Sequence, residues 1–165
     1  MSVSLRCYST SLGCPKNRVD TERLLGSLGV ALVPVESPDE AELVFINTCA
    51  FIQPATEESV RTIAQAIADI EDLPKRPLLA VAGCLVGRYH AEDLAPELPE
   101  VDLWLDNSDL EEWPAMLARK LGLPEPTVPG RILSTGPSYA WLKISDGCRH
   151  ACSFCAIPNI RGGHR

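Results

Sequence analysis

The sequence predicts an α/β protein built on a doubly wound, flavodoxin-like parallel sheet of about five strands. Two observations lead to this prediction. Short, mostly apolar runs alternate with helical stretches through residues 1–121, and strands that are apolar on both faces are typical of parallel sheets covered on both sides by helices. The 165 residues are 45% hydrophobic, which is enough apolar material for one core of this kind.

The positions of the helices and strands are predicted from the spacing of apolar residues and from residues typical of helix starts. Pro54 opens the longest helix, with Glu57 and Glu58 in its first turn, where the helix dipole favours acidic side chains. Ser108 and Glu111 form a capping box for the last helix of the sheet domain. Compact apolar runs predict strands at residues 5–11, 30–35, 43–47, 77–82 and 101–105. Helical spacing predicts helices at residues 17–28, 54–72, 89–94 and 108–122.

The chain is expected to divide into two units. Residues 1–121 form the first, and residues 122–137, rich in proline and glycine, form a linker. Residues 138–165 are expected to begin a second domain, with a new strand at 139–144 followed by a cysteine-rich loop. The chain stops before this second domain could close.

Charge and composition exclude several classes of protein. The net charge is −7, which argues against this chain alone binding a nucleic-acid backbone, because such binding needs clustered Lys and Arg. The sequence has neither a leader nor 18 consecutive apolar residues, so we expect a cytosolic protein without a membrane span. Thiols stay reduced in that compartment, and the seven cysteines therefore indicate metal or redox chemistry.

Three cysteines follow predicted strands. Cys14, Cys49 and Cys84 come just after the runs at 5–11, 43–47 and 77–82. All strands of a parallel sheet end at the same edge, where open α/β folds bind ligands, so the three thiols could converge there. Gly13 and Gly83 precede two of them and give the backbone room to approach a bulky inorganic group.

The alternative for each of these cysteines is a small core residue, since free cysteine is often buried. Three cysteines at equivalent strand ends weaken that alternative. Cys7 lies within the first strand, and for it we keep the core interpretation.

A second cysteine motif lies near the end of the chain. Cys148, Cys152 and Cys155 form a CxxxCxxC pattern in a loop after a predicted strand. Three thiolates can hold three irons of a 4Fe–4S cluster and leave the fourth iron open to a small molecule. Zinc is the alternative, with His150 or His164 completing a tetrahedral site, although common zinc patterns use CxxC pairs.

These motifs resemble the radical S-adenosylmethionine methylthiotransferase family. CxxxCxxC with an aromatic before its last cysteine resembles the radical signature, and the three spread cysteines resemble the family's N-terminal domain. Around Cys14 the sequence looks like the RimO-like branch, whereas the MiaB-like branch usually has Gln-Met-Asn after that cysteine. Thr21 departs from the Ser that is frequent there. The matching segments are residues 11–17, 20–22, 47–49, 83–85 and 156–162.

The resemblance implies two 4Fe–4S clusters and S-adenosylmethionine as cofactors. Cys148, Cys152 and Cys155 would hold the cluster that binds S-adenosylmethionine, and Phe154 would lie near its adenine. An auxiliary cluster carrying the sulfur to be inserted would be held by Cys14, Cys49 and Cys84.

The reaction that the resemblance implies is methylthiolation of the β-carbon of an aspartate in small-subunit ribosomal protein twelve. That protein would be the partner, and an electron donor and a sulfur source are also required. Because the chain contains only the beginning of the family's radical barrel, we expect it to be inactive by itself. Two other functions stay open: methylthiolation of tRNA adenosine, and a non-enzymatic zinc-binding or redox-sensing module.

Overall fold

The computed structural model describes residues 4–165 and contains one five-stranded sheet in which every neighbouring pair is parallel. The strand order is β2-β1-β3-β4-β5, the flavodoxin-like order, and this confirms the predicted fold class. The order reverses between β1 and β3, which makes their carboxyl ends the switch point of the sheet. The strands are β1 (Ser4–Ser11), β2 (Ala31–Pro34), β3 (Leu43–Thr48), β4 (Leu78–Gly83) and β5 (Leu103–Leu105).

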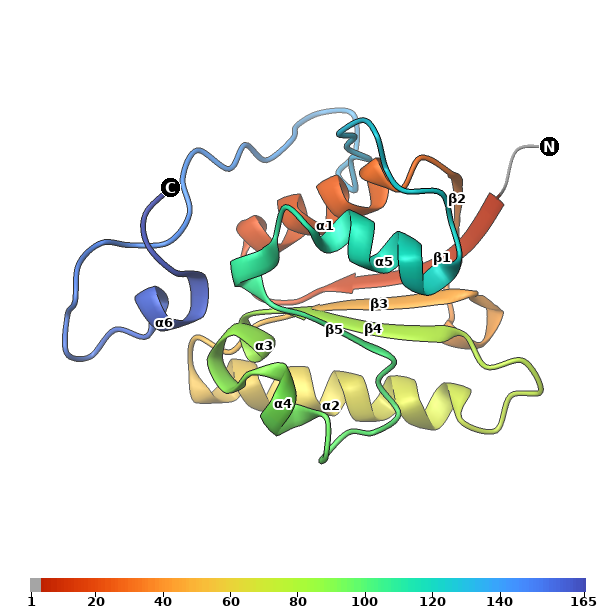
Figure 1. Cartoon of the computed structure of the whole chain (residues 1–165), viewed down its shortest axis with the longest axis horizontal. Coiled ribbons are helices and arrows are strands. Elements are labelled where there is room, and N and C mark those ends of the chain that lie inside the picture. The colour runs from red at the N-terminus through yellow and green to blue at the C-terminus, as the bar shows by residue number, and fades with distance from the viewer. Residues whose placement is uncertain (1–3) are drawn as a thin grey trace.

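Helices cover both faces of the sheet (Figure 1). On one face lie α1 (Pro15–Ser27) and α5 (Trp113–Leu121). On the other lie α2 (Gln53–Ile70), α3 (Cys84–Tyr89) and α4 (Ala91–Leu94). The short 3₁₀ turns are η1 (Pro38–Glu40) and η2 (Asn107–Asp109), and the last helix is α6 (Ile157–Arg161).

The alternation of side chains along β3 shows why this strand is apolar throughout. Leu43 and Phe45 belong to the core under α1 and α5, whereas Val44 and Ile46 belong to the core under α2 and α3. All four are fully buried. A strand buried on both faces requires apolar side chains at every position, which explains why it could be recognised from composition alone.

Two predicted helix starts are wrong. A single helix was expected at residues 89–94, but α3 already begins at Cys84 and is separated from α4 by His90, whose φ is +60°. The capping box at Ser108 does not start α5. Instead, Asp106 accepts a hydrogen bond from the backbone N–H of Ser108 and caps the 3₁₀ turn η2, and α5 begins only at Trp113. The second error arises because the Asp106 cap satisfies one short turn without committing the chain to a longer helix, whereas the break at 84–94 lies at the left-handed backbone of His90.

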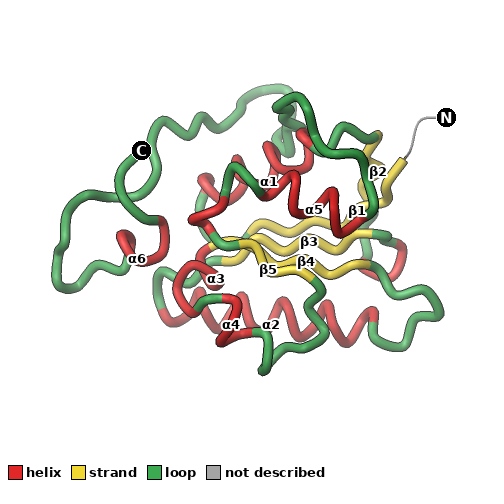
Figure 2. The backbone as a smooth tube through the Cα atoms, viewed as in Figure 1, coloured by secondary structure: helices red, strands yellow, loops and turns green. Residues whose placement is uncertain are grey.

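The strand expected at residues 139–144 is not present. This segment is extended but unpaired (Figure 2), and the side chains of Leu142 and Ile144 are 79% and 87% exposed. The carbonyl of Trp141 accepts a hydrogen bond from Arg131 instead of a strand neighbour. A β-rich sequence becomes a strand only when another strand satisfies its backbone groups, and residues 4–165 offer this segment none.

Candidate metal centre

The carboxyl edge of the sheet carries the first three predicted ligands. Cys14 is the N-cap residue of α1, three residues after the end of β1. Cys49 follows β3, and Cys84 is the first residue of α3 after β4. Cys49 and Cys84 are buried, whereas Cys14 is exposed. The three thiols therefore come from neighbouring strand ends at the switch point, two from the interior and one from the surface.

Close contact between Gly13 and Cys49 brings two of these loops together. Gly13 has φ +81°, and a Cβ built on it would lie 2.6 Å from both Cβ and Sγ of Cys49. Any other residue at this position would therefore be strained and would also collide with the ligand. This contact agrees with the sequence argument that Gly13 gives the backbone room beside a cysteine.

Two buried asparagines fix the backbone around the thiols. Asn17 donates hydrogen bonds of 2.8 Å from Nδ2 to the carbonyls of Leu12 and Thr48. Asn47 donates from its Nδ2 to the carbonyl of Asn17 at 2.9 Å. Asn17 and Asn47 are fully buried, and their hydrogen bonds replace water for carbonyl groups that the loops would otherwise leave unsatisfied. They tie the loop after β1 to the loop after β3.

Two of the thiols are coupled electrostatically. A hydrogen bond from the Cys84 thiol lowers the pKa of Cys49 to about 6, against the opposing effect of burial. Because Cys84 holds the donated proton and is itself buried, its own pKa is raised. This pair favours one thiolate at neutral pH, the form in which cysteine binds metals.

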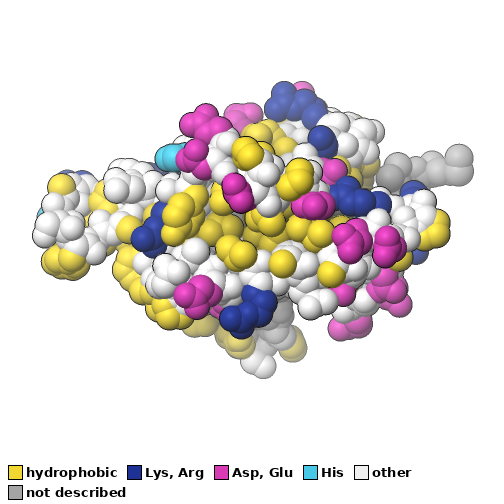
Figure 3. Space-filling view, turned by 90° about the horizontal axis from the view of Figure 1, so that it is seen from below, with side chains coloured by type: hydrophobic (Ala, Val, Ile, Leu, Met, Phe, Trp, Pro, Cys, Tyr) yellow, Lys and Arg dark blue, Asp and Glu magenta, His cyan; other side chains and the backbone are white. Residues whose placement is uncertain are grey.

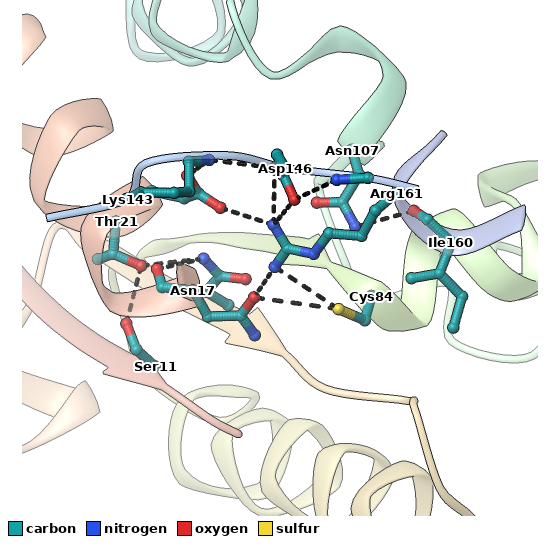
Figure 4. Close-up of polar contacts among 12 residues, drawn as sticks. Ser11, Asn17, Thr21, Cys84, Asn107, Lys143, Asp146, Ile160 and Arg161 are labelled. Atoms are coloured by element: carbon teal, nitrogen blue, oxygen red, sulfur yellow. Dashed lines mark hydrogen bonds and ion pairs between the residues drawn. The ribbon is translucent and has the colours of Figure 1, made fainter. Parts of the chain in front are cut away.

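Arg161 reaches this edge from the C-terminal segment (Figure 4). Its Nη2 lies 3.7 Å from Sγ of Cys84 and also donates to Oδ1 of Asn17. Its Nη1 donates to Oδ2 of Asp20 at 3.0 Å and to Oδ2 of Asp146 at 3.1 Å. The guanidinium is thus shared between a candidate metal ligand and two carboxylates.

Lys143 completes a buried cluster of two acids and two bases, which we call the ion cluster: Asp20, Lys143, Asp146 and Arg161. All four side chains are at most 8% exposed. Burial acts to raise the pKa of Asp146, but Arg161 and Lys143 outweigh it and hold that pKa below its usual range. The ion cluster fixes the C-terminal segment to α1, since charges removed from water require such pairing.

The second cysteine motif lies in a loop whose two ends are joined. The backbone groups of Asp146 and Arg165 exchange two hydrogen bonds, of 2.8 and 2.9 Å. Within the loop Cys152 is exposed, and Cys148 and Cys155 are half-buried. Phe154, the expected adenine contact, is 91% exposed. In this structure the second motif faces solvent.

The donor types at the sheet edge are those that hold iron–sulfur clusters. This edge offers three thiols from separate loops, a glycine that leaves space beside one of them, and a cation beside another. Within residues 4–165, no group of three or more His, Cys, Asp and Glu side chains is placed so that it could hold a metal ion. The loop at 148–155 matches a cluster in its donor type and spacing, and its thiols lie on one short segment.

Sequence reasoning missed the polar residues around the thiols. Asn17, Asp20 and Arg161 lay within segments that we matched to the family, but spacing gave them no role. One signal was present. Helix α1 buries Asn17, Asp20, Thr21 and Glu22, and a row of polar residues on the inner side of a helix indicates partners from elsewhere in the chain.

Comparison with known proteins identifies the family. Residues 6–106, more than half of the chain, match the family described as "Uncharacterized protein family UPF0004". The chain belongs to this family. The match of the UPF0004 family covers β1 from Arg6 onward and the other four strands in full, with both cysteine-bearing loops after β3 and β4, together with Cys14.

Curated relatives of this UPF0004 protein carry a more specific name. Proteins named "Ribosomal protein uS12 methylthiotransferase RimO" are 72% identical over 158 residues in Nitratidesulfovibrio vulgaris and 67% identical over 156 residues in Oleidesulfovibrio alaskensis. In Lawsonia intracellularis the identity is 58% over 162 residues. These matches cover 96%, 94% and 98% of the chain, respectively. The chain spans about 37% of the length of these relatives.

Among residues 4–165, no helix combines the length and apolar character needed to cross a bilayer.

Proposed function

We propose that this chain is part of a cytoplasmic radical S-adenosylmethionine enzyme that methylthiolates ribosomal protein uS12. The similarity to relatives of that name, at up to 72% identity, carries the proposal. The cysteine geometry at the sheet edge supports it. The activity and the substrate are proposed for the longer protein, because the chain spans about 37% of its relatives.

Each cysteine set has a proposed role. Cys14, Cys49 and Cys84 would hold an auxiliary 4Fe–4S cluster at the sheet edge. Cys148, Cys152 and Cys155 would hold the cluster that takes S-adenosylmethionine, with Phe154 near the adenine. When bound, these groups supply one-electron chemistry and sulfur transfer, and the protein supplies position and exclusion of water.

The chain's own residues prepare the auxiliary site. Cys49 and Cys84 offer their sulfur atoms from the buried side, where Arg161 of the ion cluster lies beside Cys84. Cys14 lies on the exposed side, where a reactant could approach. Helix α1 begins directly after Cys14, so this candidate ligand lies where the loop after β1 enters the helix.

The charge of the chain suits a basic protein substrate better than a nucleic acid. The net charge is −7, and on the face seen in Figure 3 Lys and Arg side chains are scattered among Asp and Glu around a hydrophobic band. Nucleic-acid binding depends on clustered positive charge. The distribution of charge therefore favours a ribosomal protein over tRNA as the substrate.

Anaerobic reconstitution with iron and sulfide tests the cofactor assignment. We expect about eight irons per chain in the wild type. Replacing either Cys14, Cys49 and Cys84 or Cys148, Cys152 and Cys155 by Ala should remove about four irons each, whereas Cys7→Ala should remove none. A colourless protein that retains zinc would contradict the proposal and support the zinc-binding alternative.

The full-length enzyme containing this chain tests the substrate. Incubated anaerobically with S-adenosylmethionine, sulfide and a reductant, it should add a methylthio group to uS12, detectable by mass spectrometry. A product found on tRNA alone would show that the enzyme belongs to the tRNA-modifying branch.

A further inference from the structure

One side chain connects the two cysteine sets. Arg161 lies six positions after Cys155 in the sequence, yet its guanidinium is 3.7 Å from the sulfur of Cys84, which follows β4. Its side chain is 4% exposed. The loop that carries the second motif therefore contacts the first set of ligands through Arg161.

The position of Arg161 is fixed from several sides. Asp20 of α1 and Asp146 of the loop accept hydrogen bonds from Nη1. The preceding residue, Ile160, is 2% exposed and receives a hydrogen bond on its carbonyl from Nδ2 of Asn107 at 3.1 Å. A Cβ on Gly87 of α3 would lie 2.4 Å from that same carbonyl oxygen, so α6 packs directly on α3.

These restraints leave Nη2 directed at a sulfur atom. Because both carboxylates bind Nη1, Nη2 is left for Cys84 and for the amide oxygen of Asn17. Asn17 is itself fixed by its hydrogen bonds to Leu12 and Thr48. A planar guanidinium can donate hydrogen bonds to a carboxylate from one nitrogen and to a thiolate from another. A lysine ammonium, in contrast, is a single point charge.

We propose that Arg161 is a positioning residue that donates a hydrogen bond to the Cys84 ligand and thereby raises the reduction potential of the auxiliary cluster. This inference rests on the proposed function, since it assumes a cluster held by Cys14, Cys49 and Cys84. Hydrogen bonds to ligand sulfurs and nearby positive charge both stabilise the reduced, more negative state of an iron–sulfur centre. The same contact holds the second motif against the sheet edge.

The test uses a chain in which only the auxiliary site can load. Cys148, Cys152 and Cys155 are replaced by Ala, the chain is reconstituted anaerobically with iron and sulfide, and the midpoint potential is measured by redox titration with electron paramagnetic resonance. Arg161→Gln and Arg161→Lys are compared with this background. Arg131→Lys is the matched control, because Arg131 also pairs with a buried carboxylate of α1, that of Glu22, but contacts none of the ligands.

The expected result is a graded shift. Arg161→Gln should move the potential furthest to negative values, Arg161→Lys should move it less because the charge is kept, and Arg131→Lys should leave it unchanged. Iron content should stay equal in variants that fold. Equal potentials in all four proteins would overturn the role of Arg161 while leaving the cluster assignment intact. A background chain that takes up no iron would overturn the proposed function and this inference with it.

A second measurement does not depend on the stability of the Arg161 variants. With arginine labelled by ¹⁵N, hyperfine spectroscopy of the reduced background chain should detect a weak ¹⁵N coupling to the cluster. Absence of that coupling in an iron-loaded chain would contradict the hydrogen bond to Cys84, whatever the stability of the Arg161 variants.

Discussion

Gly13 and Cys49 touch across the switch point of the sheet: a Cβ on Gly13 would lie 2.6 Å from the Cys49 sulfur. Gly13 ends the loop after β1, and Cys49 follows β3, which is paired with β1 in parallel. The contact therefore joins two loops that each supply one candidate ligand. It also makes the absence of a side chain at Gly13 a requirement of the site.

Replacing Gly13 with alanine should impair the auxiliary site. Its φ of +81° is strained for alanine, at a cost of about 1 kcal/mol, and the added methyl group would displace the Cys49 side chain. We expect the variant to fold, with reconstituted iron reduced by about four per chain. Iron content and urea unfolding measure the two effects separately.

Gly29→Ala provides the control for this experiment. Gly29 has φ +69°, but a Cβ there meets nothing within 4 Å. It should therefore lose a similar amount of stability and no iron. If the Gly13 variant loads as much iron as the Gly29 variant, the contact with Cys49 does not matter to the site.

Cys7 should behave as a core residue. Burial raises the pKa of its thiol to about 12, and its side chain packs in the core under α1. In the native, metal-free chain at pH 8, iodoacetamide should modify Cys7 at least about a hundredfold more slowly than exposed Cys152, because little thiolate forms. Peptide mass spectrometry reports each site. Comparable rates without denaturant would show that Cys7 is accessible.

The stability of the chain should depend on pH through Glu22. Burial acts to raise its pKa, but hydrogen bonds from the Ser134 side chain and backbone, together with Arg131, outweigh this and lower it. A carboxylate with a depressed folded pKa stabilises the protein fully above its unfolded pKa of about 4.3. That contribution is lost as the pH falls further, through the lower folded value.

Glu22→Gln tests this dependence. At pH 7 the variant should be less stable by about 2 kcal/mol, since charged hydrogen bonds to Arg131 and Ser134 are lost. Below about pH 4 the wild type should approach the variant as its own carboxylate is protonated. Urea unfolding across this range gives both curves, and a gap that widens on acidification would contradict the assignment.

Asp20 should hold the C-terminal segment in place. Its two carboxylate oxygens form ion pairs with Lys143 and Arg161. Asp20→Asn removes the negative charge that these buried cations pair with, which should lower the free energy of unfolding by about 3 kcal/mol. We expect the segment to detach while the sheet stays folded. Trypsin should then cleave after Lys143 and Arg161, whose side chains are only 8% and 4% exposed in the native chain.

Asp69→Asn is the control for this release. Asp69 lies on the exposed side of α2, where it accepts a hydrogen bond from Gln65. Its variant should keep the wild-type cleavage pattern. Unchanged protection of Lys143 and Arg161 in the Asp20 variant would show that packing of α6 on α3 suffices to hold the segment.

Several features could be predicted from the sequence because a single physical rule determines each of them. The apolar run at 43–47 had to be a buried strand, and the observed β3 ends one residue later. Parallel strands place their carboxyl ends at one edge, so Cys14, Cys49 and Cys84 could be assigned to that edge before any coordinates. The predicted end of the last helix near residue 122 is also confirmed, since α5 ends at Leu121 and Gly122 follows it in a left-handed conformation that glycine adopts readily.

The sequence by itself determined the layers of this protein, the edge that carries three thiols and the family resemblance, because these depend on local periodicity and on short motifs. Tertiary structure decided that residues 139–144 stay unpaired, because a strand depends on partners that spacing along a chain cannot supply. It also decided the ion cluster. Arg161 and Asp20 are 141 positions apart, and only the packing of α6 on α3 brings that guanidinium out of water to the carboxylate and to the Cys84 sulfur.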